Sequence, residues 1–228
     1  MSIFGSLSLI LFISSIISLL GQFHQAANPY NIGHPGGTRG RAHIHKPRNV
    51  YIDLGANNGE SISTFMGKAS NQGVQIDGSN AVKGGISELI RGFLPDALWH
   101  IVAVEANDQH DGTLLTLKDT MLKHPNVSSF SLYNGTAVSD KDGTIEFIWD
   151  SARRGDAGST TMSESYSAVG NRMSIPALDI VTLFRKENIH VDDFVVLKVD
   201  IEGAEYNVVR RILLSHLWRM IDKIAVEW

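Results

Sequence analysis

Short apolar runs recur along most of the chain, and segments whose apolar residues have helical spacing lie between them. Runs of this length are typical of buried strands. The predicted strands are Val50–Leu54, Trp99–Val104, Phe130–Val138, Gly143–Trp149, Phe194–Val199 and Ile221–Val226. The predicted helices are Ser61–Lys68, Ile86–Leu94, Thr113–Lys123, Asp179–Lys186 and Ala204–Leu213. This alternation predicts an α/β fold with a doubly wound, mostly parallel sheet and right-handed crossovers.

Two internal segments do not follow these patterns. Asn71–Gly85 is polar and rich in glycine, and it is typical of a loop inserted between the first two strands. Ser151–Ser174 has no apolar periodicity, and a loop of this length inside a compact domain is usually functional or disordered. A cover for a substrate and a plain surface segment are equally compatible with its composition.

The N-terminal residues have a different character from the rest of the chain. Ile3–Leu20 is almost wholly apolar and carries no charge, which is close to the minimum length for a membrane-spanning helix. A cleaved secretory signal is the alternative, but a basic start is missing and residues 24–27 match a cleavage site poorly. We therefore predict a hydrophobic helix in residues 1–22 that anchors the chain in a membrane, on a side that the sequence does not decide. If the segment is cleaved, the domain enters the secretory pathway.

Residues 23–48 are rich in Gly, Pro, His and Arg without periodicity, which predicts a linker or stem before a folded domain at 49–228. His43 and His45 have the identity of metal ligands, but no carboxylate lies near them in the sequence. A solvated linker is the better interpretation, and we predict no metal site.

Composition narrows the functional classes. The formal net charge is −4, so no basic excess indicates nucleic-acid binding. The chain has no cysteine, which excludes disulfides, thiolate metal sites and a thiol nucleophile. Its 43% hydrophobic content is ordinary for a globular protein, so stability must come from a packed core.

The first predicted strand leads into the chain's most informative turn. Asp53 opens the pattern Asp-x-Gly-x-Asn-x-Gly, in which Gly55, Asn57 and Gly59 follow at alternate positions. Glycine and asparagine tolerate the left-handed backbone that a sharp strand-to-helix turn requires. In open α/β folds such a turn lies at the carboxyl edge of the sheet, where ligands bind. An ordinary tight turn is the alternative.

Acids end two further strands. Glu105 follows Val104, and Asp200 follows Val199 with Glu202 two residues later. The carboxyl ends of parallel strands meet at one edge, so these acids are expected to converge on one crevice. Glu105 is placed to accept hydrogen bonds from both hydroxyls of a ribose, although a strand-end acid facing water would have the same position.

Asp200 and Glu202 are the candidate catalytic acids, because one carboxylate can orient a substrate or stabilise positive charge and the other can take a proton. Lys198, the third candidate catalytic residue, alternates with Asp200 along the strand and can face the same side, where it can pair with either Asp200 or Glu202. A simpler alternative is that the acids only cap the following helix. A ligand with ribose hydroxyls and a positive centre suits this edge, and S-adenosylmethionine has both.

Five blocks in order resemble the FkbM-type methyltransferases: Tyr51–Gly59, Val104–Asn107, Ala137–Asp140, Leu197–Glu205 and Ile224–Trp228. The resemblance implies a class I, Rossmann-like fold and an S-adenosylmethionine-dependent enzyme that typically methylates a hydroxyl oxygen of a small-molecule or glycan acceptor. It implies that Asp53, Gly55, Ala56, Asn57 and Gly59 hold the methionine part of the cofactor and Glu105 the ribose. Ala106 and Ala137 belong to the implied cofactor contacts, and Asp200 and Glu202 would lie beside the transferred methyl group.

The chain departs from this family in two places. An insertion between Gly67 and Ala97 lengthens the region between the first two strands and is expected to reshape the pocket. The family fold also continues past the last predicted strand into a hairpin, which this sequence does not contain.

Two other functions fit parts of the sequence. A membrane-anchored glycosyltransferase would use Asp200 and Glu202 to hold a divalent metal and a sugar nucleotide, but it leaves the Gly55 turn and Glu105 unexplained. A non-catalytic module that binds S-adenosylmethionine is the third hypothesis. The sequence does not identify the acceptor or the oligomeric state.

Overall fold

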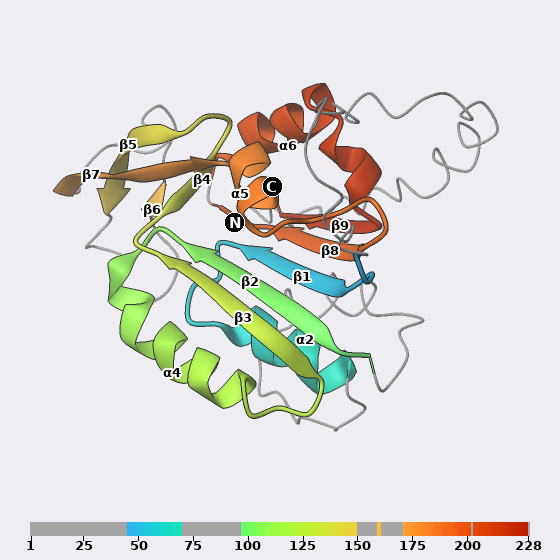
Figure 1. Cartoon of the computed structure of the whole chain (residues 1–228). Coiled ribbons are helices and arrows are strands. Elements are labelled where there is room, and N and C mark those ends of the chain that lie inside the picture. Colours follow the sequence, from blue (N-terminus) through green and yellow to red (C-terminus); the bar gives the residue numbers. More distant parts are fainter. Residues whose placement is uncertain (1–44, 70–96, 150–158, 161–170, 202, 228) are drawn as a thin grey trace, which may run out of the picture.

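A computed structural model of the chain describes residues 45–69, 97–149, 159–160, 171–201 and 203–227 (Figure 1). Its central sheet has the order β3-β2-β1-β8-β9, and every neighbouring pair in it is parallel. The strands are β1 (Asn49–Leu54), β2 (Trp99–Glu105), β3 (Val127–Asn134), β8 (Phe194–Val199) and β9 (Lys223–Val226). The predicted parallel α/β sheet is therefore confirmed.

The strand order places a switch point beside β1. The chain passes outward from β1 to β2 and β3, and it later returns to β8 on the opposite side of β1. Open α/β folds bind ligands outside the carboxyl ends of the strands at such a point. The strands begin at the right of Figure 1 and end at the left, so this carboxyl edge lies at the left. We use amino edge for the opposite end of the sheet.

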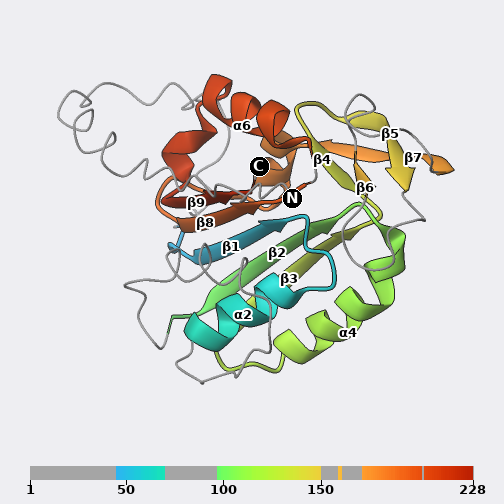
Figure 2. The same ribbon diagram turned by 180° about the vertical axis from the view of Figure 1, so that it is seen from behind.

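Helices cover both faces of the central sheet. Side chains of α2 (Glu60–Ala69) and α4 (Asp111–Met121) pack on one face with Tyr51 and Ile101. On the other face α5 (Ile180–Lys186) and α6 (Glu205–Leu214) pack on Ile52 and Leu197. Two short 3₁₀ helices, η2 (Asp108–His110) and η3 (Leu217–Met220), complete the helical elements of the described residues. Figure 2 shows α2 and α4 in front of the sheet. The four α helices of the described residues occur where helical spacing predicted them.

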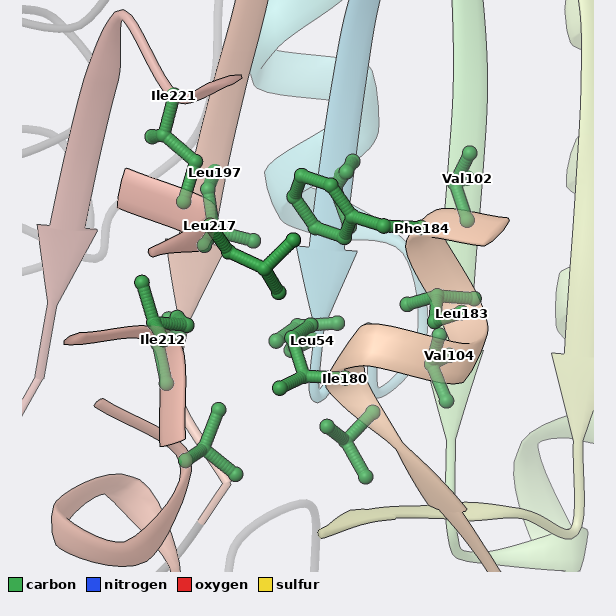
Figure 3. Packing of buried hydrophobic residues seen from close by; sticks show 14 of the residues in the cluster. Leu54, Val102, Val104, Ile180, Leu183, Phe184, Leu197, Ile212, Leu217 and Ile221 are labelled. Atoms are coloured by element: carbon green, nitrogen blue, oxygen red, sulfur yellow. The ribbon is translucent and has the colours of Figure 1, made fainter. Parts of the chain in front are cut away.

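The larger core cluster lies between α5, α6 and the sheet (Figure 3). Leu54 of β1, Val104 of β2 and Leu197 of β8 meet Ile180 and Leu183 of α5 there, and all five are buried. A fully buried aliphatic side chain stabilises a fold by about 1.5–3 kcal/mol. This packing holds the ends of β1 and β8 side by side, and those ends carry the candidate site.

A second sheet, with the order β4-β7-β5-β6, stands beyond the ends of β2 and β3. Its strands are β4 (Ala137–Ser139), β5 (Gly143–Trp149), β6 (Ser159–Thr160) and β7 (Asn171–Asp179). The pair β4 and β7 is parallel, whereas β5 runs antiparallel to both β6 and β7. The sequence predicted β5 but not that it belongs to a separate sheet.

The chain passes from one sheet to the other at Gly135. One continuous strand over Phe130–Val138 was predicted, but Asn134 ends β3 and Ala137 begins β4. Gly135 has a φ of +57°, and the Thr136 N–H donates to the Glu105 carbonyl oxygen at 2.9 Å. This turn interrupts the apolar alternation only briefly, which is why the pattern appeared continuous.

Residues 45–48 belong to the folded domain. The His45 ring nitrogen Nε2 lies 2.7 Å from Asp193 Oδ1, and the Arg48 guanidinium lies 3.0 Å from Asp193 Oδ2. The domain therefore begins at least four residues before the predicted boundary at residue 49. No helix among the described residues is long and apolar enough to cross a membrane. The predicted anchor, the predicted helix Ile86–Leu94 and most of Ser151–Ser174 lie outside the described residues.

Candidate active site at the carboxyl edge

The turn after β1 packs directly on the end of β8. Gly55 has a φ of +80°, and a Cβ at this position would lie 1.7 Å from the Asp200 carbonyl oxygen. The Asp200 N–H donates to the Leu54 carbonyl oxygen at 3.0 Å. Because a backbone oxygen occupies the space that any side chain would need, only glycine fits here. Asn57 and Gly59 also have positive φ, of 50° and 83°, as the turn prediction required.

Five N–H groups of this turn, those of Gly55, Ala56, Asn57, Gly59 and Glu60, donate hydrogen bonds inside the protein. Those of Gly55 and Ala56 donate to the Val104 carbonyl oxygen at 3.0 and 3.1 Å, and that of Gly59 donates to the Ala56 carbonyl oxygen at 2.8 Å. The N–H of Asn57 donates to a carboxylate and that of Glu60 to the Asn58 side chain, at 2.7 and 3.0 Å. A phosphate cradle needs such donors to point at the ligand. This turn is therefore poorly suited to a sugar nucleotide or a dinucleotide.

A buried lysine lies between two acids below the turn. Lys198 Nζ is 3.2 Å from Asp53 Oδ1 and 2.9 Å from Asp200 Oδ2, and it donates to the Gly55 carbonyl oxygen at 3.3 Å. Burial acts to lower the pKa of Lys198, but the charges of Asp53 and Asp200 outweigh it and raise the pKa to about 12. Lys198 is therefore a charged ammonium at neutral pH, held between Asp53 and Asp200. Of the two acids predicted as partners of Lys198, Asp200 contacts it, and Glu202 lies outside the described residues.

Asp53 is enclosed rather than exposed to a ligand. Its side chain is fully buried, and besides Lys198 it accepts hydrogen bonds from the hydroxyls of Tyr51, at 3.3 Å, and Ser61. Burial and the charge of Asp53 raise the pKa of Tyr51 well above its ordinary value, so Tyr51 stays a neutral donor. Asp53 therefore acts through Lys198 and the turn, as a positioning residue.

Asp200 is the acid of this group that reaches the surface. Its side chain is 27% exposed, whereas that of Asp53 is fully buried. Asp200 Oδ2 is the oxygen that contacts Lys198 Nζ. A carboxylate held by a buried ammonium keeps a defined orientation. A group that positions a substrate or stabilises a positive charge needs such an orientation.

Glu105 joins two turns instead of standing free at a strand end. Its Oε2 accepts from the Asn57 N–H at 2.7 Å and its Oε1 accepts from the Asn107 N–H at 2.8 Å. Burial raises the pKa of Glu105, and these two backbone bonds oppose that shift. Each oxygen keeps a second lone pair, so the predicted bond to a ribose remains geometrically open. The structure adds a structural role that sequence reasoning missed.

Two more acids belong to this edge, and sequence reasoning did not single them out as site residues. Glu205 is buried and accepts from the N–H groups of Ile201 and Gly203, both at 2.8 Å, which shapes the loop after β8. Glu227 follows β9, and its N–H donates to the Val199 carbonyl oxygen at 2.9 Å. Burial and the nearby charge of Asp200 raise the pKa of Glu227. Both acids lie within the blocks Leu197–Glu205 and Ile224–Trp228, which was the available signal.

The remaining predicted site residues have mixed positions. Ala56 is buried in the core beneath the turn. Ala106 packs against Ala137 and Ile175, where the second sheet meets the central one. Ala137 is itself buried, so its side chain packs inside the protein. Glu202 lies outside the described residues.

Taken together, the described part of this edge has excess negative charge. Asp53, Glu105, Asp200, Glu205 and Glu227 gather at the ends of the strands, and Lys198 is the cation held among them. The residues at 45–69, 97–149, 171–201 and 203–227 contain no cluster of three metal-ligand side chains. These carboxylates fit a ligand with a positive centre and hydroxyl groups better than they fit a phosphate.

Comparison with known families gives one match. A family model described as the Methyltransferase FkbM domain matches residues 53–222, which begin at Asp53 and include Glu105, Lys198 and Asp200. Neither a curated protein nor a solved structure matches the chain.

Proposed function

The chain belongs to the FkbM methyltransferase domain family, and from this premise we propose that it transfers the methyl group of S-adenosylmethionine to a hydroxyl oxygen. The observation that carries the choice of donor is the closed turn at Gly55–Glu60. Five of its N–H groups donate hydrogen bonds inside the protein, while carboxylates line the same edge. An edge of this kind favours the ammonium and sulfonium of S-adenosylmethionine over a phosphate-bearing ligand.

The residues at the edge divide the work between them. Bound S-adenosylmethionine supplies an activated methyl group on a positive sulfur. Asp200 faces that charge and orients the acceptor, which accelerates the reaction because reactants held in line need no further ordering. Glu202, two residues later in the sequence, takes the proton that the acceptor hydroxyl loses. Lys198 and Asp53 keep Asp200 and the Gly55 turn in place. Glu105 holds the turn that approaches the donor and offers its free lone pairs to the ribose hydroxyls.

Calorimetric titration of the purified full chain tests this proposal. We expect S-adenosylmethionine and S-adenosylhomocysteine to bind, and UDP-glucose with Mn²⁺ to give no heat. Asp200→Asn should weaken S-adenosylmethionine more than S-adenosylhomocysteine, because only the former has the sulfonium charge. Asp192→Asn, an exposed acid at the amino edge, is the matched control. Binding of the sugar nucleotide instead would reject the methyl-donor assignment, and binding without methyl transfer to any hydroxyl acceptor would leave a module that only binds the donor.

A further inference from the structure

The amino edge of the central sheet differs in character from the site edge. Strands β1, β2, β3 and β8 begin at this edge. The exposed fractions of Leu98, Leu122 and Val191, which lie there, are 55%, 47% and 65%. Single exposed apolar residues are normal on a protein surface, but several on one edge indicate an interaction surface. We name these three residues, together with 45–49 and 190–191, the amino-edge surface.

Contacts along the edge connect Leu98 and Val191 through residues 45–49. Asn49 Nδ2 donates to the Leu98 carbonyl oxygen at 3.1 Å, and the Phe194 N–H donates to the Arg48 carbonyl oxygen at 2.8 Å. The rings of His45 and His190 stack at 3.8 Å, and Val191 is the next residue. Leu98 and Val191 therefore lie on one surface with residues 45–49 between them.

The described chain also enters the domain on this surface. Asp193 Oδ1 lies 2.7 Å from His45 Nε2 and accepts from the Arg48 N–H at 2.9 Å, and Asp193 Oδ2 lies 3.0 Å from the Arg48 guanidinium. These contacts fix the first described residues to the edge. The uncharged apolar segment Ile3–Leu20 precedes this point in the sequence. An apolar run of this length is a candidate for insertion into a bilayer. A bilayer that holds Ile3–Leu20 is therefore connected through the chain to the amino edge.

Charge separates the two edges further. At the amino edge Lys46 and Lys123 are exposed, and the carboxylate of Asp193 is compensated by Arg48 and His45. Asp192 and Asp222 are exposed acids there, so the edge has no strong charge of either sign. The carboxyl edge is acidic instead. Anionic lipid headgroups would repel the acidic carboxyl edge, whereas they would not repel the amino edge and could bind its lysines.

From these observations we propose that the amino-edge surface faces a lipid bilayer to which Ile3–Leu20 attaches the chain. Leu98, Leu122 and Val191 then lie at the headgroup boundary, where apolar side chains gain by leaving water. The acidic carboxyl edge points away from the bilayer. A strand of six residues spans about 20 Å at about 3.3 Å per residue. The candidate active site therefore meets acceptors from the aqueous side rather than at the level of the headgroups.

Site-specific labelling of the full chain tests the orientation. The chain has no cysteine, so Val191→Cys, Leu98→Cys and Tyr206→Cys each provide one labelling site for an environment-sensitive dye. Tyr206 is the matched control, because it is 68% exposed and lies in the first turn of α6, near the acidic edge. Each labelled protein is reconstituted into vesicles of phosphatidylcholine and phosphatidylserine that contain a brominated lipid. Thermal melting verifies that each variant is folded.

We expect the brominated lipid to quench the dyes at positions 98 and 191 at least threefold more strongly than the dye at position 206. Equal quenching at the three positions, or stronger quenching at 206, would overturn the orientation. Failure of the folded full chain to associate with the vesicles would overturn the bilayer as the partner. The readout does not involve S-adenosylmethionine, so it stands or falls independently of the proposed reaction.

Discussion

Gly55 is the residue on which the contact between β1 and β8 depends. Gly55→Ala would have to relieve a contact of 1.7 Å with the Asp200 carbonyl oxygen, and Ala is strained at a φ of +80°. We expect a loss of more than about 4 kcal/mol in unfolding free energy, or no folded protein. Gly112→Ala in α4 is the control, because nothing lies within 4 Å of its Cβ position. It should change stability by no more than about 1 kcal/mol, toward greater stability. Similar behaviour of the two variants in urea unfolding would contradict the packing described.

The raised pKa of Lys198 predicts how the stability of the protein depends on pH. The pKa of Lys198 is raised from 10.5 to about 12, so its ion pairs contribute fully below pH 10.5, and this contribution is lost as the pH rises toward 12. Lys198→Met leaves Asp53 and Asp200 without their partner and should cost about 3–5 kcal/mol at neutral pH. The gap in stability between the natural protein and this variant should narrow by about 1 kcal/mol between pH 10.5 and 12. A gap that is independent of pH in that window would show that Lys198 is not held by the two acids.

Glu105 separates a ligand contact from a structural role. Glu105→Ala removes the acceptor of two backbone N–H groups, those of Asn57 and Asn107, and should lower the unfolding free energy by about 2 kcal/mol or more. The affinity for S-adenosylmethionine should also fall at least tenfold. Calorimetry and chemical denaturation measure the two effects separately. Unchanged stability with weakened binding would restrict Glu105 to the ribose, and unchanged binding would remove it from the site.

Single residues were predictable from the sequence where a regular period applied. The alternation of Lys198 and Asp200 along one strand predicted their pairing, and it was found. The enclosure of Asp53 was not predictable, because it needs the hydroxyl of Ser61, which reaches Asp53 only after α2 has packed. The backbone partners of Glu105 likewise depend on the path of two turns that no local pattern reveals.

At the scale of elements, the start of α6 shapes the loop beside Asp200. Glu205 accepts from the N–H groups of Ile201 and Gly203, so Glu205→Ala leaves two donors of this loop without their acceptor. We expect a loss of about 1–3 kcal/mol and weaker binding of S-adenosylmethionine, because Asp200 loses its fixed position. Asn207→Ala, exposed in the same helix, should leave both quantities within experimental error. If Glu205→Ala behaved like Asn207→Ala in melting and calorimetry, the loop would not depend on this acid.

The elements with strong periodicity were predicted well, and the second sheet was not. Strands β1, β2 and β8 are apolar runs buried between helices, so their identity follows from composition. In contrast, β7 has Pro176 within it and exposes Met173, so it lacks the alternation that marks a strand. Its pairing with β5 and β4 is tertiary and could not be recognised from its own residues.

At the scale of the whole molecule, the two edges of the central sheet differ in charge and in the chain segments that they carry. The carboxyl edge gathers the acids of β1, β2, β8 and β9 around Lys198, and the amino edge receives the chain from the apolar N-terminal segment. The flanks of the insertion between Gly67 and Ala97, the C-terminal end of α2 and the start of β2, lie at the amino edge. Residues 70–96 lie outside the described residues, so their effect on the pocket stays a prediction.

Amide hydrogen exchange with and without S-adenosylhomocysteine tests the central claim, a methyl-donor site at the carboxyl edge, most directly. A ligand that binds only the folded state slows the opening of the segments it contacts. Exchange should slow in residues 53–60 and 105–110, and it should stay unchanged in residues 45–48 and 188–193. No protection at saturating ligand, or protection confined to the amino edge, would contradict the site.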